Sequence, residues 1–197
     1  NGRRTVWDDP FKPGRNGLAG LAQCIEMHAP LALVVLMLGT NDFQSMHPHT
    51  AWHSAQGIAA LVAAIRSADW VVLGPGSWFT SVMTHLLVPE VREALEVTRA
   101  RRLLILNLDP GSGETAGFSA ERHLETFAEL APNLHLDVVL ADPAVVDDPE
   151  QLEAACARLG ATLFVAPVGR RDRAGEHDPL RFAAAVRDIV TTPRPAR

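Results

Sequence analysis

Short apolar runs alternate along the chain with longer stretches in which apolar residues recur at helical spacing. Helical spacing falls at about 17–27, 51–67, 80–99, 119–130, 149–159 and 178–190. This alternation is typical of a parallel sheet covered by helices. The runs of strand length are Leu33 to Leu38, Trp70 to Leu73, Leu103 to Leu108, Leu136 to Leu140 and Leu163 to Val168.

Several predicted helices also carry start signals in their own residues. Ser119 offers a side-chain cap, and Asp148 and Asp178 each stand directly before a proline at the first helical position. The pattern therefore predicts an α/β fold with an open, mainly parallel sheet of about five strands and helices on both faces, flavodoxin-like or Rossmann-like in three layers. We expect a single domain over residues 1–191 and a flexible tail over 192–197.

Composition narrows the range of partners. Hydrophobic residues make up 47% of the chain and charged residues 21%, which is typical of a folded globular protein. The formal net charge is −5 and the basic residues are scattered, so we expect no nucleic-acid partner. No apolar run approaches bilayer length and no secretory signal is visible, which predicts a cytoplasmic protein without a membrane partner.

Three smaller features change this picture little. Cys24 and Cys156 lie in apolar helical stretches and are expected to be reduced structural thiols. The first residues have the composition of a loop interior, so we expect a truncated start. The histidines near residue 50 lack a carboxylate or cysteine that would complete a ligand set, so neither a metal site nor a cofactor is predicted.

The first chemical motif follows the first predicted strand and reads Leu38-Gly39-Thr40-Asn41-Asp42. An asparagine at the ligand edge of the sheet can donate hydrogen bonds to a developing oxyanion. With Asn1-Gly2-Arg3-Arg4 and Ser54-Ala55-Gln56-Gly57-Ile58, residues 1 to about 66 resemble the middle of an SGNH (GDSL-type) esterase. The resemblance implies that Gly2 and Asn41 supply oxyanion donors.

That esterase resemblance leaves out the catalytic groups. The family's Gly-Asp-Ser nucleophile and its late Asp-x-x-His motif have no counterpart in the chain. Asp172 and His177 are the nearest late acid and histidine, but their spacing does not match, so a structural role is favoured for both. An oxyanion hole alone cannot perform acyl transfer.

The second motif is a strand, a glycine turn and a hydroxyl-rich helix start, Trp70 to Ser81. Glycines allow close backbone approach and hydroxyls donate hydrogen bonds, which suits an anion such as phosphate. A strand-to-helix turn also needs glycine and a serine cap for purely structural reasons, so both interpretations stay open. The aromatic that we expect to line a ligand cleft is Trp78, whereas Trp52 and Trp70 are expected to pack in the core.

Residues 67 to about 191 resemble the C-terminal part of the gluconeogenesis-factor family, which is related to the phospholactate transferases. The resemblance rests on the segments Leu73 to Ser81, His85 to Pro89, Leu106 to Leu108, Gly113 to Phe118 and Asp137 to Asp142. It implies a phosphate or uridine-diphosphate-sugar ligand. The residues implied to face it are Gly74, Gly76, Ser77, Thr80 and Ser81, with a second loop at Asn107, Glu114 and Thr115.

The residues of the second loop also have a structural interpretation. Asn107 could instead satisfy backbone groups, and Glu114 could be an exposed loop acid.

The family's N-terminal glycine-rich loop has no counterpart in this chain. We therefore predict a chimera of residues 1–66 and 67–191 without a complete active site. We expect it not to be an enzyme and to bind phosphate weakly at most. The alternatives are an SGNH-type esterase and a purely structural scaffold. We also expect a homodimer through an exposed sheet edge.

Overall fold

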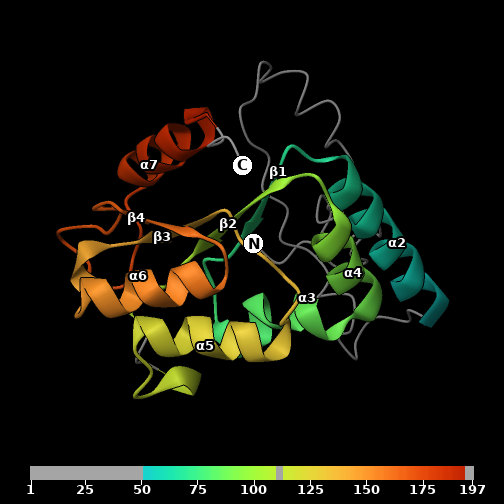
Figure 1. Ribbon diagram of the computed structural model, residues 1–197, viewed down its shortest axis with the longest axis horizontal. Helices are drawn as coiled ribbons and strands as arrows, with labels where there is room; N and C mark the ends of the chain where they lie inside the picture. Colours follow the sequence, from blue (N-terminus) through green and yellow to red (C-terminus); the bar gives the residue numbers. More distant parts are fainter. Residues whose placement is uncertain (1–50, 110–112, 194–197) are drawn as a thin grey trace, which may run out of the picture.

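The structure, a computed structural model, describes residues 51–109 and 113–193 (Figure 1). Within these ranges four parallel strands pair in the order β1-β2-β3-β4. The predicted α/β class with a mainly parallel sheet is therefore confirmed, while the predicted strand Leu33 to Leu38 and the helix at 17–27 lie outside the described residues. The strands are β1 Trp70–Leu73, β2 Arg101–Ile105, β3 Val138–Ala141 and β4 Thr162–Val165.

Helices cover both faces of the sheet (Figure 1). One face packs against α7 alone among the described helices, and the other packs against α2 to α6. Alternate residues of one strand point to opposite layers, so that Leu104 contacts the α2 to α6 side and its neighbours Leu103 and Ile105 contact the α7 side. The helices are α2 Ala51–Ser67, α3 Thr84–Leu87, α4 Pro89–Val97, α5 Ala120–Leu130, α6 Pro149–Arg158 and α7 Pro179–Thr191.

The helix predicted over 80–99 is not continuous, and that prediction is wrong. A five-residue π-helix, Trp78–Val82, comes first, because the N–H groups of Val82 and Met83 donate to carbonyls five residues back, those of Ser77 and Trp78. The short α3 follows, and Val88 is then extended, with φ −93° and ψ 109°. Proline disfavours helical backbone in the residue before it, so Pro89 ends α3 and starts α4.

The predicted start signals are confirmed at three helices. The Ser119 side chain accepts a hydrogen bond from the backbone N–H of Arg122 at the start of α5. Asp148 and Asp178 accept from the first turns of α6 and α7, each ahead of a proline. None of the helices in the two described ranges combines the length and the apolar character needed to cross a membrane.

Candidate functional site

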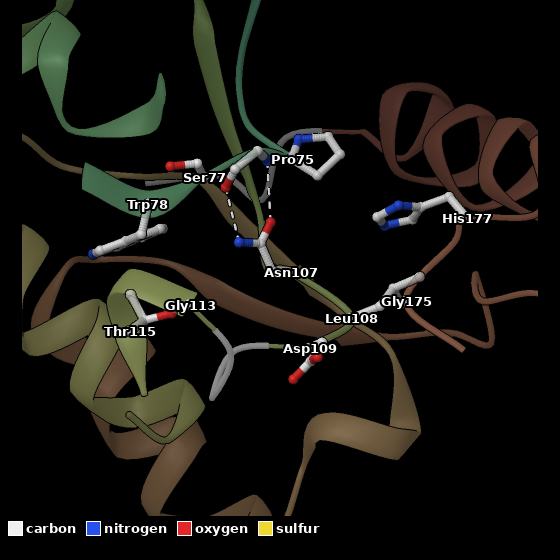
Figure 2. A pocket seen from close by; sticks show the side chains of 11 residues that line it. Pro75, Ser77, Trp78, Asn107, Leu108, Asp109, Gly113, Thr115, Gly175 and His177 are labelled. Atoms are coloured by element: carbon white, nitrogen blue, oxygen red, sulfur yellow. Dashed lines mark hydrogen bonds between the residues drawn. The ribbon is translucent and has the colours of Figure 1, made fainter. Parts of the chain in front are cut away.

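A cleft of about 700 Å³ opens at the carboxyl edge of β1 and β2. Its wall comes from the loop after β1, the segment after β2, the 3₁₀ turn Gly113–Thr115 and a hairpin before α7 (Figure 2). Within the described residues the wall contains no lysine or arginine. The lining residues are Pro75, Gly76, Ser77, Trp78, Asn107, Leu108, Asp109, Gly113, Thr115, Gly175 and His177.

Gly74 joins the loop to the end of β1 and is required by packing. Its φ is +77°, a conformation that favours glycine, and a Cβ placed there would lie 2.7 Å from the backbone oxygen of Ile105. The residue is therefore needed for the close approach of the loop to β2, and it does not line the cleft.

Asn107, directly beyond β2, holds the loop by two hydrogen bonds to one residue. The Gly76 N–H donates to Asn107 Oδ1 at 3.0 Å, and Asn107 Nδ2 donates to the Gly76 carbonyl at 2.8 Å (Figure 2). Asn107 therefore supplies hydrogen-bond partners to backbone groups, which is one of the two roles that the sequence left open for it. The amide also lines the cleft, beside the loop that it fixes.

The hydroxyl groups of the loop divide between the cleft and its surroundings. Ser77 lines the cleft, and its hydroxyl is hydrogen-bonded to that of Thr80. Neither Thr80 nor Ser81 belongs to the wall, because the π-helix carries both away from it. Of the five loop residues singled out from the sequence, Gly76 and Ser77 meet at the cleft.

Trp78 is only 1% exposed, so it anchors the loop in the core. Its ring meets His123 edge to face at 4.8 Å between centroids and lies 6.4 Å from Phe127. The side chain thus forms part of the cleft floor and offers no open stacking face. By contrast, Trp52 is 62% exposed, so the expectation that it packs in the core is wrong.

The second predicted loop reaches the cleft through Thr115. Thr115 is buried and lines the wall together with Gly113 (Figure 2). Glu114 lies between them in the 3₁₀ turn, but its side chain is outside what the structure describes. The described part of this loop therefore contributes one hydroxyl and a glycine turn to the site.

Six wall residues were not predicted as site residues: Pro75, Leu108, Asp109, Gly113, Gly175 and His177. His177 reaches the cleft because residues 169–177 form a hairpin closed by an antiparallel bridge between Gly169 and His177. Burial lowers the pKa of the His177 imidazole, and the negative charge of Asp142 opposes that shift. The Asp178-Pro179 helix start was a visible signal that residue 177 adjoins the ligand edge.

Asp142, the last residue of the Asp137 to Asp142 segment, fixes the base of this hairpin. Its carboxylate accepts from the backbone N–H groups of Val168 at 2.8 Å and Gly169 at 2.7 Å, and also from that of Ala144 at 2.9 Å. The end of β3 is thereby tied to the chain that follows β4.

The oxyanion residues Gly2 and Asn41 lie outside the described residues, and so do two of the histidines near residue 50, His47 and His49. Within the described ranges, no group of three or more histidine, cysteine, aspartate or glutamate side chains is placed to hold a metal ion.

Comparison with known proteins supports one of the two resemblances. A family model described as 2-phospho-L-lactate transferase CofD matches residues 45–161. The putative gluconeogenesis factor of Mycobacterium leprae is 47% identical over 128 residues, and that of Mycobacterium tuberculosis H37Rv is 48% identical over 129. Each match covers 64% of this chain, and 35% and 37% of the two relatives respectively.

A solved structure shares the fold. The crystal structure of a UPF0052 family member from Bacillus halodurans superposes with a TM-score of 0.51 at 24% identity, over 66% of this chain and 45% of that one. At this identity the likeness concerns the fold alone, and it agrees with the parallel α/β sheet described above.

These findings correct the functional prediction. The match begins at residue 45, inside the segment assigned to an esterase, and no finding supports an esterase segment. A chimera without a complete active site, an SGNH-type esterase through Gly2 and Asn41, and an inert scaffold are all contradicted by a family with a specific function. The expectation of a non-enzyme conflicts with a family described as a transferase. The chain belongs to the 2-phospho-L-lactate transferase CofD family.

Proposed function

We propose that the cleft binds a phosphate-bearing ligand, with a uridine-diphosphate sugar as the first candidate, and that it forms part of the substrate site of a transferase. The family description names a 2-phospho-L-lactate transferase, and the relatives are called gluconeogenesis factors. Because the match spans little more than a third of those relatives, the activity of the whole protein is included in this proposal.

One observation carries the proposal: Ser77 stands on the cleft in a loop whose backbone is fixed by the Asn107 amide. A donor that is already held in place gives up little conformational freedom when a ligand arrives. The Gly76 N–H is paired with Asn107, so the loop's contribution to an anion centres on Ser77.

The described wall carries the acidic Asp109 but no lysine or arginine, so a bound ligand would be held by hydrogen bonds. Without a lysine or arginine on the described wall, a phosphate group would be bound by donors such as the Ser77 and Thr115 hydroxyls. Hydrogen bonds of this kind fix the orientation of a group without screening all of its charge. We therefore expect moderate affinity and a defined ligand orientation.

The test is thermal unfolding of the chain with and without uridine-diphosphate N-acetylglucosamine. A ligand that binds only the native state must raise its stability, by about 2.7 kcal/mol at a concentration of 100 times Kd. Ser77→Ala should reduce the upward shift because it removes the hydroxyl on the cleft. Ser81→Ala removes the same group from the same segment but off the wall, and it should keep the shift.

The proposal fails if neither uridine-diphosphate N-acetylglucosamine nor 2-phospho-L-lactate moves the transition at millimolar concentration. It also fails if Ser77→Ala and Ser81→Ala change the shift equally, because the cleft would then have no special part in binding.

A further inference from the structure

His177 faces the cleft from the side opposite Trp78 and Thr115 (Figure 2). Its ring is half-buried, and its edge packs against Phe182 of α7 with centroids 5.2 Å apart. Contact with Phe182 accounts for the burial of the ring carbons. The ring nitrogens need a separate explanation.

Nε2 of His177 is buried and has no hydrogen-bond partner among the described residues. Buried polar groups are nearly always paired, because a donor or acceptor withdrawn from water without a partner is costly. A histidine that lines a cleft and has an unpaired ring nitrogen is therefore placed to meet a polar group of a bound ligand.

The hairpin holds this side chain in place. The Arg170 N–H donates to the Glu176 carbonyl at 2.8 Å, and the Asp178 N–H donates to the Val168 carbonyl at 2.8 Å, on either side of His177. Asp178 then caps α7 through the N–H groups of its first turn. Backbone pairing on both sides gives the ring a fixed approach to the cleft.

Charges around the ring indicate which group it would meet. Four acidic residues lie near the ring: Asp142 at the base of the hairpin, Asp109 on the cleft wall, and the flanking Glu176 and Asp178. Arg170 is paired with Asp172 at 2.7 Å. Burial nonetheless lowers the pKa of His177, so that the ring is neutral near pH 7. A neutral imidazole offers one donor and one acceptor, and this matches a hydroxyl or an amide.

We propose that His177 is a ligand-binding residue that hydrogen-bonds a neutral hydroxyl or amide group of the ligand, across the cleft from the phosphate site at Ser77. This inference rests on the proposed function and extends it, because it assigns an orientation: phosphate toward the β1 loop, and the uncharged polar part toward the hairpin.

The experiment is calorimetric titration of the chain with uridine-diphosphate N-acetylglucosamine. His177→Ala should raise Kd about tenfold, which is the size of one lost hydrogen bond to an otherwise unpaired group. His177→Gln should recover part of the loss, since its amide also donates and accepts. Arg173→Ala is the matched control, because it breaks the exposed Arg173 to Glu176 ion pair of the same hairpin away from the wall, and it should leave Kd unchanged.

Ring nitrogen NMR signals of His177 in the complex supply a second readout that a purely structural role would not move. A neutral ring whose nitrogen signals shift when the ligand binds is the expected result, whereas a protonated ring in the complex would overturn the assignment to a neutral group. Unchanged affinity in folded His177→Ala would overturn the inference while leaving the Ser77 site standing. Absence of binding by the unaltered chain would overturn both.

Discussion

The side chain of Asn107 shapes the site by fixing the backbone of the loop after β1. Its amide pairs with both backbone groups of Gly76 and so continues, for one residue, the pairing of β1 with β2. The neighbouring Ser77 is left on the wall of the cleft. Asn107 therefore holds the loop in place, and Ser77 presents its side chain to the cleft.

Cys156 in α6 illustrates a residue whose reactivity is removed by packing. It is fully buried, and burial raises the pKa of its thiol to about 12. Because the thiolate is the reactive form, we expect no reaction with Ellman's reagent at about pH 8 in the native state and complete reaction after unfolding. A Cys24→Ser variant leaves Cys156 as the one thiol. Native reaction at the unfolded rate would contradict the prediction.

At the scale of elements, the junction between β1 and the next helix decides where the loop hydroxyls point. The π-helix Trp78–Val82 and the extended Val88 break what the sequence pattern presents as one helix. The buried ring of Trp78 fixes the start of this broken segment against α5, through His123 and Phe127. The cleft therefore depends on the contact between the β1 loop and the neighbouring strand and helix.

Gly74→Ala tests that junction. The substitution places a Cβ both at positive φ and 2.7 Å from the Ile105 backbone oxygen, so the strand end must shift. Gly117→Ala is the matched control, because Gly117 also has positive φ, at 83°, but a Cβ there meets nothing within 4 Å. We expect urea unfolding to show a loss of about 1–2 kcal/mol for Gly117→Ala and about 1–3 kcal/mol more for Gly74→Ala. Equal losses would mean that the close approach is not required.

At the scale of the whole molecule, the described sheet ends at β1 on one side and β4 on the other. Val165 of β4 is 45% exposed, so this end of the sheet is only partly covered by the described residues. Pairing of two chains through a sheet edge stays a prediction. The three-layer arrangement itself places His85, His123 and His177 in partly or fully buried positions.

These histidines give the molecule a pH dependence. Burial lowers the pKa of His85, His123 and His177 below the ordinary value of 6.5, so the unfolded chain binds more protons than the folded one at mildly acid pH. Their stabilising effect is present above pH 6.5 and is lost as the pH falls through the lowered values. We expect the free energy of unfolding to decrease from about pH 7.5 to about pH 5.5, by at most about 1.4 kcal/mol per pH unit for each histidine.

Urea unfolding at several pH values measures this slope, and a His123→Gln variant should flatten it. His123 is the most deeply buried of the three, and its Nδ1 is already paired with the Ser119 carbonyl at 2.7 Å. A stability that rises on acidification would contradict the prediction.

The local pattern of the sequence determined the class of the fold, the four described strands and the starts of α5, α6 and α7. Each of these depends on residues close together in the chain: a run of apolar side chains, a cap, or a proline. The resemblance of the Leu73 to Ser81 segment likewise pointed to the loop that forms one wall of the cleft.

Only the tertiary structure decided which of those loop residues share a cleft. Ser77 faces it while Thr80 and Ser81 do not, because the packing of Trp78 and the bonds to Asn107 set the direction of the turn. His177, a hundred residues further along the chain, also lines the cleft. The bridge between Gly169 and His177 and the hydrogen bond from the Gly169 N–H to Asp142 place it there. Periodicity and caps carry no information about such distant contacts, so the orientation of the site had to come from the fold.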